Sequence, residues 1–280
     1  MIRRLALLGL LVAAMARGGA AHAATESALR FPVPGVAGPD IVTRLCMPDG
    51  GATTGLVLIN HGTAGPAFRA ALEPAGCAEE AVRYFLDRGH PVGLPLRRGH
   101  GVTGGEFTES SGPCADPDYA HAGQEAARDI GAALAGLLRR PDVPGLPALV
   151  IGHSAGGWGT LALAASDPPG VGGFVLFSPG RGGPGGVMDG MPGPRCAPER
   201  LLAAAARFGA TARAPILLIH AANDRFFGPG FARRLQAAIE AAGGHARLTL
   251  APASGEDGHG FLFAEGASAI WGPMLEGFPP

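Results

Sequence analysis

Three side chains suited to nucleophilic catalysis, Ser154, Asp224 and His259, each stand shortly after an apolar stretch that predicts a strand. A serine hydroxyl is a poor nucleophile at neutral pH unless a neighbouring base removes its proton. An imidazole is the usual base, and a carboxylate orients the imidazole and stabilises its charged form. If the fold brings the three side chains together, they therefore predict attack on an acyl carbonyl.

Ser154 is the centre of Gly152-His153-Ser154-Ala155-Gly156, which matches the pattern G-x-S-x-G. Residues 148–151 predict a buried strand and residues 155–166 a helix, so the serine falls on a sharp strand-to-helix turn. Cβ atoms two residues before and after it would collide with the neighbouring strand and helix. In so glycine-rich a chain, roughly 0.2 matches to this pattern are expected by chance. The alternative to a catalytic serine is therefore a glycine-rich turn in which the serine has no function. The flanking strand and helix favour the catalytic turn.

Strands and helices alternate along the remaining chain. The predicted strands are 41–47 (at an edge), 55–60, 91–96, 148–151, 174–177, 215–220 and 246–251, and the predicted helices are 78–88, 118–140, 155–166, 199–208, 229–242 and 265–276. This alternation predicts a doubly wound, mostly parallel α/β sheet with helices on both faces. Ligands bind such sheets beyond the carboxyl ends of the strands. The loops that begin at His61, His153, Ser178, Ala221 and Pro252 should therefore share one edge.

Four segments carry a family resemblance, which extends over nearly the whole chain after residue 23: Asn60-His61-Gly62, Gly152-His153-Ser154-Ala155-Gly156, Asn223-Asp224 and Gly258-His259-Gly260. The chain resembles the α/β-hydrolase superfamily and, within it, the dienelactone hydrolase-like exported serine hydrolases of bacteria. The resemblance implies nucleophile Ser154, acid Asp224 and base His259, with an oxyanion hole formed by the backbone N–H groups of Thr63 and Ala155. Dienelactone hydrolases proper have cysteine at the turn, and the serine here favours ordinary ester chemistry.

Asp257 is the alternative to Asp224 as the acid, because it lies only two residues before His259. Residues two apart in an extended loop do not face one another. A loop from the neighbouring strand can instead place its carboxylate beneath the imidazole edge that faces away from the serine. We therefore predict that Asp224 is the acid and that Asp257 and Glu256 are solvated loop residues.

The predicted function is hydrolysis of small-molecule carboxylic esters through an acyl-enzyme, with no metal and no organic cofactor. Two alternatives remain: a serine peptidase or amidase of the same fold, and a catalytically idle binding protein. Residues 179–198 are rich in glycine and proline and have too few apolar residues for a large cap domain. Acyl chain length, natural substrate and oligomeric state are not specified by the sequence.

The first 23 residues predict a signal peptide. Arg3 and Arg4 precede an apolar run, and Ala21-His22-Ala23 fits a cleavage site. Residues 24–280 would then form one α/β-hydrolase domain, periplasmic or secreted, without stable membrane insertion. A formal net charge of −1 indicates no nucleic-acid surface.

The cysteines, Cys46, Cys77, Cys114 and Cys196, have no spacing typical of a zinc site. In an exported protein they predict at least one disulfide, with buried free thiols as the alternative. The preferred pair is Cys114 with Cys196, because both fall in loops at the carboxyl edge of the sheet.

Several other polar and aromatic residues have structural interpretations. His61 and His153 should pack beside the site, and His220 should be a core residue. Arg97 and Arg98 should hold loops rather than bind a substrate carboxylate. Trp158, Phe226 and Phe227 could line an acyl pocket or pack in the core. Surface or loop positions are expected for His90, His100, His121 and His245.

Overall fold

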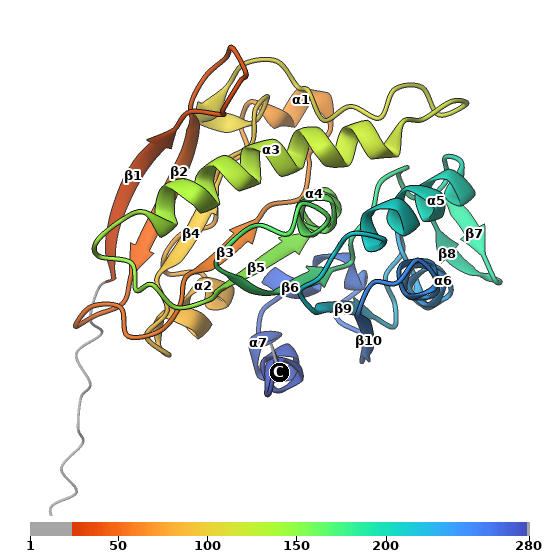
Figure 1. Cartoon of the computed structure of the whole chain (residues 1–280). Coiled ribbons are helices and arrows are strands. Elements are labelled where there is room, and N and C mark those ends of the chain that lie inside the picture. The colour runs from red at the N-terminus through yellow and green to blue at the C-terminus, as the bar shows by residue number, and fades with distance from the viewer. Residues whose placement is uncertain (1–23, 279–280) are drawn as a thin grey trace, which may run out of the picture.

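The structure of the protein is a computed structural model, which describes residues 24–278. These residues are organised around an eight-stranded sheet in the order β1-β2-β4-β3-β5-β6-β9-β10 (Figure 1). From β4 to β10 in this order the strands pair in parallel, whereas β2 is antiparallel to both β1 and β4. The strands are β1 Thr25–Phe31, β2 Ile41–Met47, β3 Val57–Asn60, β4 Val92–Pro95, β5 Ala148–His153, β6 Val171–Phe177, β9 Ile216–Ala221 and β10 Ala246–Ala251. The predicted doubly wound, mostly parallel sheet is confirmed.

Helices cover both faces of this sheet. The α-helices are α1 Pro66–Arg69, α2 Glu80–Leu86, α3 Tyr119–Leu138, α4 Ala155–Ala164, α5 Pro198–Gly209, α6 Pro229–Ala241 and α7 Ser268–Trp271, and the 3₁₀ helices are η1 Gly101–Thr103, η2 Gly258–Phe263 and η3 Gly272–Leu275. The longest of them, α3, runs across the sheet beside α4 (Figure 1). Its first turn is capped by Asp118, whose side chain accepts a hydrogen bond from the backbone N–H of His121 at 2.8 Å.

Two hydrophobic layers result from alternating side chains on the central strands. On one face, Leu58, Val150 and Leu218 pack with α3, α4, α5 and α6. On the other face, Val57, Ile151 and Leu217 pack with α2, α7 and η2. Burial on both faces explains why β3, β5 and β9 have near-continuous apolar sequences instead of alternating ones.

The structure differs from the predicted elements mainly at the two ends of the chain. The strand predicted at the edge, β2, is the second strand, because β1 pairs outside it. The half-exposed sequence of β1, TESALRF, lacks the apolar pattern of the core strands. The helix predicted over residues 265–276 is only the short α7 followed by η3, because Gly272 packs against the Tyr84 ring and Pro273 lacks a backbone N–H.

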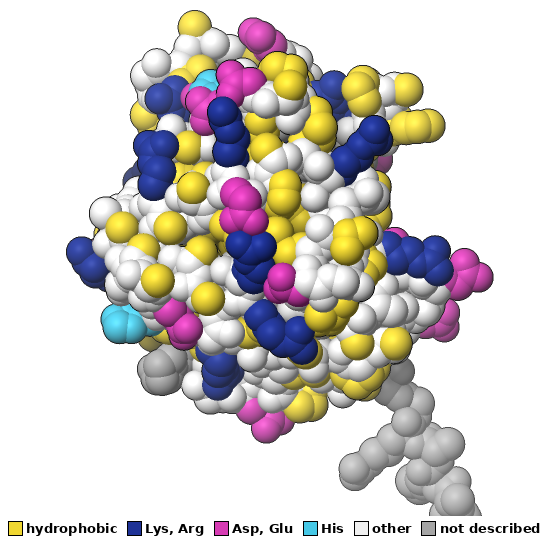
Figure 2. Space-filling model, turned by 90° about the vertical axis from the view of Figure 1, so that its right-hand side faces the viewer, with side chains coloured by type: hydrophobic (Ala, Val, Ile, Leu, Met, Phe, Trp, Pro, Cys, Tyr) yellow, Lys and Arg dark blue, Asp and Glu magenta, His cyan; other side chains and the backbone are white. Residues whose placement is uncertain are grey.

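The segment after β6 contains a small hairpin, formed by β7 Gly186–Met188 and β8 Met191–Gly193. It packs on α6 and adds no separate core, which agrees with the predicted lack of a large cap domain. On the face that carries this hairpin, basic and acidic side chains are interspersed (Figure 2). This distribution agrees with the small net charge of the chain.

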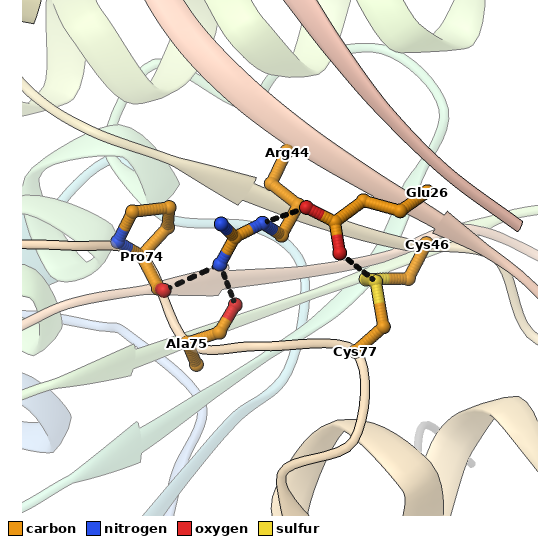
Figure 3. The surroundings of a disulfide bond; sticks show 6 residues. All are labelled: Glu26, Arg44, Cys46, Pro74, Ala75 and Cys77. Carbon is orange, nitrogen blue, oxygen red and sulfur yellow. Dashed lines mark hydrogen bonds and ion pairs between the residues drawn. A yellow bond between two sulfur atoms is a disulfide. The ribbon is translucent and has the colours of Figure 1, made fainter. Parts of the chain in front are cut away.

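A disulfide between Cys46 and Cys77 joins β2 to the segment before α2. Beside it, Arg44 forms an ion pair with Glu26 at 2.7 Å and donates hydrogen bonds to the carbonyl oxygens of Pro74 and Ala75 (Figure 3). These contacts fix the two strands at this edge of the sheet to the chain that leads into α2.

A second disulfide, between Cys114 and Cys196, confirms the predicted pair. It joins the loop after β4 to the segment after β8. Within residues 24–278, no helix has the length and the apolar character that crossing a membrane requires. The predicted signal peptide, residues 1–23, lies outside the described residues.

Candidate active site

Ser154 stands between β5 and α4 with φ 53° and ψ −120°, a backbone conformation that non-glycine residues rarely adopt. Hydrogen bonds from neighbouring segments fix this turn. The backbone N–H of Ser154 donates to Phe177 O at 3.0 Å, and its carbonyl oxygen accepts from the N–H of Gly180 at 3.2 Å. The conformation is therefore held by β6 and the loop that follows it, rather than by the turn alone.

The two glycines of the motif stand where no side chain fits. A Cβ atom at Gly152 would lie 2.4 Å from Thr160 Oγ1, and one at Gly156 would lie 2.2 Å from His61 O. The first turn of α4 thus packs directly against the ends of β5 and β3. This close approach is the physical reason for the G-x-S-x-G pattern in this chain.

The structure brings Ser154, His259 and Asp224 together, with the His259 ring between the other two side chains. The Ser154 hydroxyl lies 3.0 Å from Nε2 of His259, and Nδ1 of His259 lies 3.3 Å from Oδ2 of Asp224. With the ring proton on Nδ1, the imidazole donates to the carboxylate and accepts from the serine hydroxyl. The side chains come from the turn after β5, the loop after β9 and the 3₁₀ helix η2 after β10, at the carboxyl edge of the sheet.

Asp224 is fully buried and is held by the backbone of its own loop. Its Oδ1 accepts hydrogen bonds from the N–H groups of Phe226 and Phe227 at 2.8 and 2.9 Å. Burial alone would raise the pKa of Asp224, but the hydrogen bond from His259, the neighbouring imidazoles and the Phe227 N–H outweigh burial and hold the pKa well below its usual range. This carboxylate therefore stays ionised beside the imidazole.

Asp257 has a different role from the solvated one that we predicted. Its Oδ1 accepts hydrogen bonds from the backbone N–H groups of Arg225 and His259, both at 3.0 Å. The Asn223 side chain likewise forms hydrogen bonds with the backbone, in this case with Ser254 and Gly255. Asp257 and Asn223 thus join the acid loop to the histidine loop through the backbone, and the hydrogen bonds of the Asp257 carboxylate within residues 24–278 go to backbone N–H groups rather than to the imidazole.

The loop after β3 lies against Ser154. A Cβ atom at Gly62 would lie 3.3 Å from the Cβ of Ser154, so only glycine allows this approach without displacement. Thr63 and Ala155, the predicted oxyanion residues, line the same pocket as Ser154 and His259. The assignment of their backbone N–H groups as oxyanion donors remains a prediction.

The pocket above Ser154 has a volume of about 420 Å³. Its walls include Phe226, Phe227 and the Cys114–Cys196 disulfide, and Arg181 is the charged side chain among the described residues that line it. The Phe226 ring stacks on the His259 ring with centroids 4.1 Å apart. Trp158 does not line the pocket but packs in the core, donating from Nε1 to Tyr119 O at 2.8 Å.

A larger hollow, of about 760 Å³, lies between α3, α4, α5 and the segment after β1. Its lining combines apolar residues with Arg128, Arg139 and Arg207, and includes no histidine or carboxylate among the residues that the structure describes. The smaller pocket, which contains the serine and the imidazole, is therefore the candidate active site.

The other histidines beside the site remain neutral near pH 7. Nε2 of His153 donates to His259 O at 2.7 Å, and desolvation, together with the nearby His259, lowers the pKa of His153 to about 4. Desolvation also lowers the pKa of His61 and of His220, whose Nδ1 bonds to Phe227 O. These residues have the packing roles predicted for them.

Arg97 and Arg98 hold loops, as predicted, through buried ion pairs. Nε of Arg97 lies 3.1 Å from Oε1 of Glu109, and Nε of Arg98 lies 2.6 Å from Oδ1 of Asp129. His100 lies on a loop, as expected, but it is completely buried there beside Glu109. No motif or periodicity in the sequence marks Glu109 as a functional residue.

Among residues 24–278, no cluster of three or more histidine, cysteine, aspartate or glutamate side chains is arranged to hold a metal ion. No family model matches the chain, and a comparison with curated protein sequences finds no match. Solved structures, by contrast, match nearly the whole chain.

The acylaminoacyl peptidase of Pyrococcus horikoshii superimposes with a TM-score of 0.63 at 13% identity, over 91% of this chain but 42% of that one. Est1E of Butyrivibrio proteoclasticus gives a TM-score of 0.55 at 15% identity, over 90% of this chain and 99% of that one. This chain has the α/β-hydrolase fold. A further α/β-hydrolase, from Klebsiella pneumoniae, is named for a proposed dienelactone hydrolase activity and gives a TM-score of 0.60 at 15% identity, over 92% and 99% of the two chains.

The chain spans less than half the length of the Pyrococcus peptidase. Identities this low establish a common fold and leave activity to be argued from the site. Within the α/β-hydrolase fold, the serine turn, the acid loop and the histidine loop of this chain occupy the carboxyl edge of the sheet, where ligands bind.

The geometry predicts that Asp224→Asn and Asp257→Asn differ greatly in their effect on ester hydrolysis. Asp224→Asn removes the carboxylate that orients the imidazole, and the comparable change in a protease lowers kcat by on the order of 10⁴. Asp257→Asn keeps an oxygen that can accept the two backbone N–H groups, so its cost should be about tenfold or less. Steady-state kinetics on both variants, with unchanged thermal unfolding as the control, provide the measurement. The reverse ranking would assign the acid to Asp257.

Proposed function

We propose that this chain is a serine hydrolase that cleaves carboxylic esters through an acyl-enzyme intermediate. The observation that carries the proposal is that the His259 ring contacts the Asp224 carboxylate on one side and the Ser154 hydroxyl on the other. It is supported by the pocket beside Ser154 and by the fold that the chain has in common with esterases and a peptidase.

In the first half-reaction, His259 takes the proton of the Ser154 hydroxyl while Oγ attacks the acyl carbonyl carbon. Asp224 keeps the ring oriented and stabilises the imidazolium that forms. The negative charge that develops on the carbonyl oxygen would be received by the N–H groups of Thr63 and Ala155, each worth about 3 kcal/mol in comparable sites. The imidazolium then protonates the departing alkoxide, which leaves as the alcohol.

The second half-reaction uses the same residues with water in place of the alcohol. His259 removes a proton from a water molecule that attacks the acyl-enzyme carbonyl, and the proton returns to Oγ of Ser154 as the acid product leaves. No residue outside the three side chains and the two N–H donors is needed to balance the reaction.

We further propose that the protein acts outside the cytoplasm, as a periplasmic or secreted enzyme. The two disulfides fit an oxidising compartment, since cytosolic thiols are kept reduced. The predicted cleavage after Ala23 belongs to this proposal.

The proposed activity predicts that a fluorophosphonate probe labels the purified protein at Ser154 at neutral pH. Ser154→Ala should prevent labelling and lower kcat for p-nitrophenyl acyl esters by on the order of 10⁶. These esters should be cleaved faster than the matching p-nitroanilides, because p-nitrophenolate is a better leaving group than the p-nitroanilide anion. An unlabelled, inactive wild type would indicate a binding protein, and faster cleavage of the anilides would indicate a peptidase or amidase.

The proposed mechanism predicts that the rate of ester hydrolysis rises with pH between about 5 and 8, because the imidazole of His259 must be neutral to act as a base. Asp224 and His153 should not contribute, since the lowered pKa of each keeps its protonation state constant over this range. Initial rates measured across this range, with chemistry limiting, provide the test.

The control for this experiment shows that the protein stays folded over the pH range of the rate measurements. His100, whose pKa is lowered to about 4 by burial and by Arg97, binds a proton in the unfolded chain below about pH 6.5 but not in the folded one. The free energy of unfolding should therefore decrease as the pH falls from about 6.5 to 4. Full recovery of the rate after a return from pH 5 to pH 7.5 excludes unfolding as the cause. A rate that does not change between pH 5 and 8 would contradict the assignment of His259.

A further inference from the structure

Glu109 is a completely buried carboxylate on the loop between η1 and α3, at 1% exposure. It contacts two arginines from different parts of the chain. Nε of Arg97 lies 3.1 Å from Oε1 and 3.3 Å from Oε2 of Glu109, and Nη2 of Arg181 donates to Oε2. Burial would raise the pKa of Glu109, but the charges of Arg97 and Arg181 outweigh burial and lower it. The carboxylate is therefore ionised and holds both guanidinium groups.

The remaining donors of Arg97 are directed at the loop after β3. Nη1 donates to His61 O at 2.7 Å, and Nη2 donates to Gly62 O at 3.2 Å. The Gly62 carbonyl and the Thr63 N–H belong to one planar trans peptide group, so they point in opposite directions. A carbonyl fixed on Arg97 therefore turns the Thr63 N–H away from Arg97, and Thr63 lines the pocket that contains Ser154.

A second connection runs through His100. Its Nδ1 lies 3.5 Å from Oε1 of Glu109, and its Nε2 lies 3.0 Å from Oγ1 of Thr63. Burial and the charge of Arg97 lower the pKa of His100 to about 4, so the ring is neutral near pH 7. A proton on Nδ1 donates to the carbonyl oxygen of Arg97, 3.3 Å away, with the Glu109 carboxylate beside it. Nε2 is then free to accept from the Thr63 hydroxyl.

We infer that Glu109 is a positioning residue for acyl transfer: through Arg97 and His100 it fixes the Gly62–Thr63 peptide with its N–H directed at the site where the oxyanion develops. This inference rests on the proposed function, because it needs an oxyanion at that place. Glu109 itself does not line the pocket, although its partner Arg181 does. The effect on the Gly62–Thr63 peptide passes through Arg97 and His100.

The test compares Glu109→Gln with Asp129→Asn as a matched control. Asp129 is equally buried and pairs with Arg98, which makes no hydrogen bond to the loop at residues 61–63 among the described residues. Both substitutions remove one buried charge and lower thermal stability. Only Glu109→Gln should lower kcat for p-nitrophenyl esters, by about 10- to 100-fold, since misplacing one oxyanion donor has effects of this size.

Two further readouts separate positioning from a general structural effect. The pH midpoint of the rate should not move in Glu109→Gln, because Glu109 makes no hydrogen bond to His259 or Asp224 in the described chain. Hydrogen–deuterium exchange of a peptide that spans residues 60–65 should be faster in Glu109→Gln and unchanged in Asp129→Asn. Wild-type kcat together with wild-type exchange in folded Glu109→Gln would overturn the inference.

If Glu109→Gln does not fold, the same measurements are made on Glu109→Asp. This variant keeps the charge, but its side chain is one methylene shorter and reaches the arginines less well. A lowered kcat with faster exchange at residues 60–65 supports the inference, and wild-type values of both overturn it. The two proposals fail separately. A wild type that reacts with neither esters nor fluorophosphonate contradicts the proposed function, whereas the exchange experiment still measures whether Glu109 holds the loop.

Discussion

The close contact between the first turn of α4 and the ends of β3 and β5 is the constraint on which the site depends. At Gly152 and Gly156 a single added carbon would overlap backbone or side-chain atoms, so the helix can approach the strands only because these residues lack a side chain. That approach, with the hydrogen bonds that Ser154 donates to Phe177 O and accepts from the Gly180 N–H, keeps Ser154 at positive φ and presents its hydroxyl above the sheet edge. The proposed nucleophile is thus positioned by packing of the core.

The site depends on the core in a second way, through buried charge. Taking Arg97, Glu109 and Arg181 out of water costs free energy that their mutual attraction only partly returns, so such a cluster is weak evidence for stability. Its geometry is specific instead: the donors of Arg97 are divided between Glu109 and two carbonyl oxygens of one loop. A cluster of this kind is better explained by the conformation that it imposes on that loop than by any gain in folding free energy.

The features that could be predicted from the sequence are those in which a candidate site residue stands next to a strong strand or helix signal. The strand before Ser154 and the helix after it have strong apolar signals. The three side chains singled out in the sequence lie together in the structure, with His259 between Ser154 and Asp224. The disulfide between Cys114 and Cys196 could be proposed because both residues fall in loops at one edge of the sheet. These inferences needed only short-range pattern and the topology of a parallel sheet.

The features that could not be predicted depend on contacts between distant residues without periodicity. Glu109 lies in a polar loop, and its partner Arg181 is 72 residues away. The edge strand β1 has no buried side chain and few apolar residues, so its sequence gives a weak strand signal and its pairing with β2 defines it. Asp257 was assigned to solvent because its partners are backbone N–H groups, which no sequence pattern reveals.

The central claim is that acyl transfer passes through Ser154, and identification of the acylated residue tests it most directly. Turnover of p-nitrophenyl acetate would be stopped with acid on the millisecond scale, and the digested protein analysed by mass spectrometry. We predict one acetyl group, on Ser154, that forms with the first release of p-nitrophenol and disappears once the substrate is exhausted. An acetyl group that forms and decays at the rate of turnover on any other residue would contradict the account.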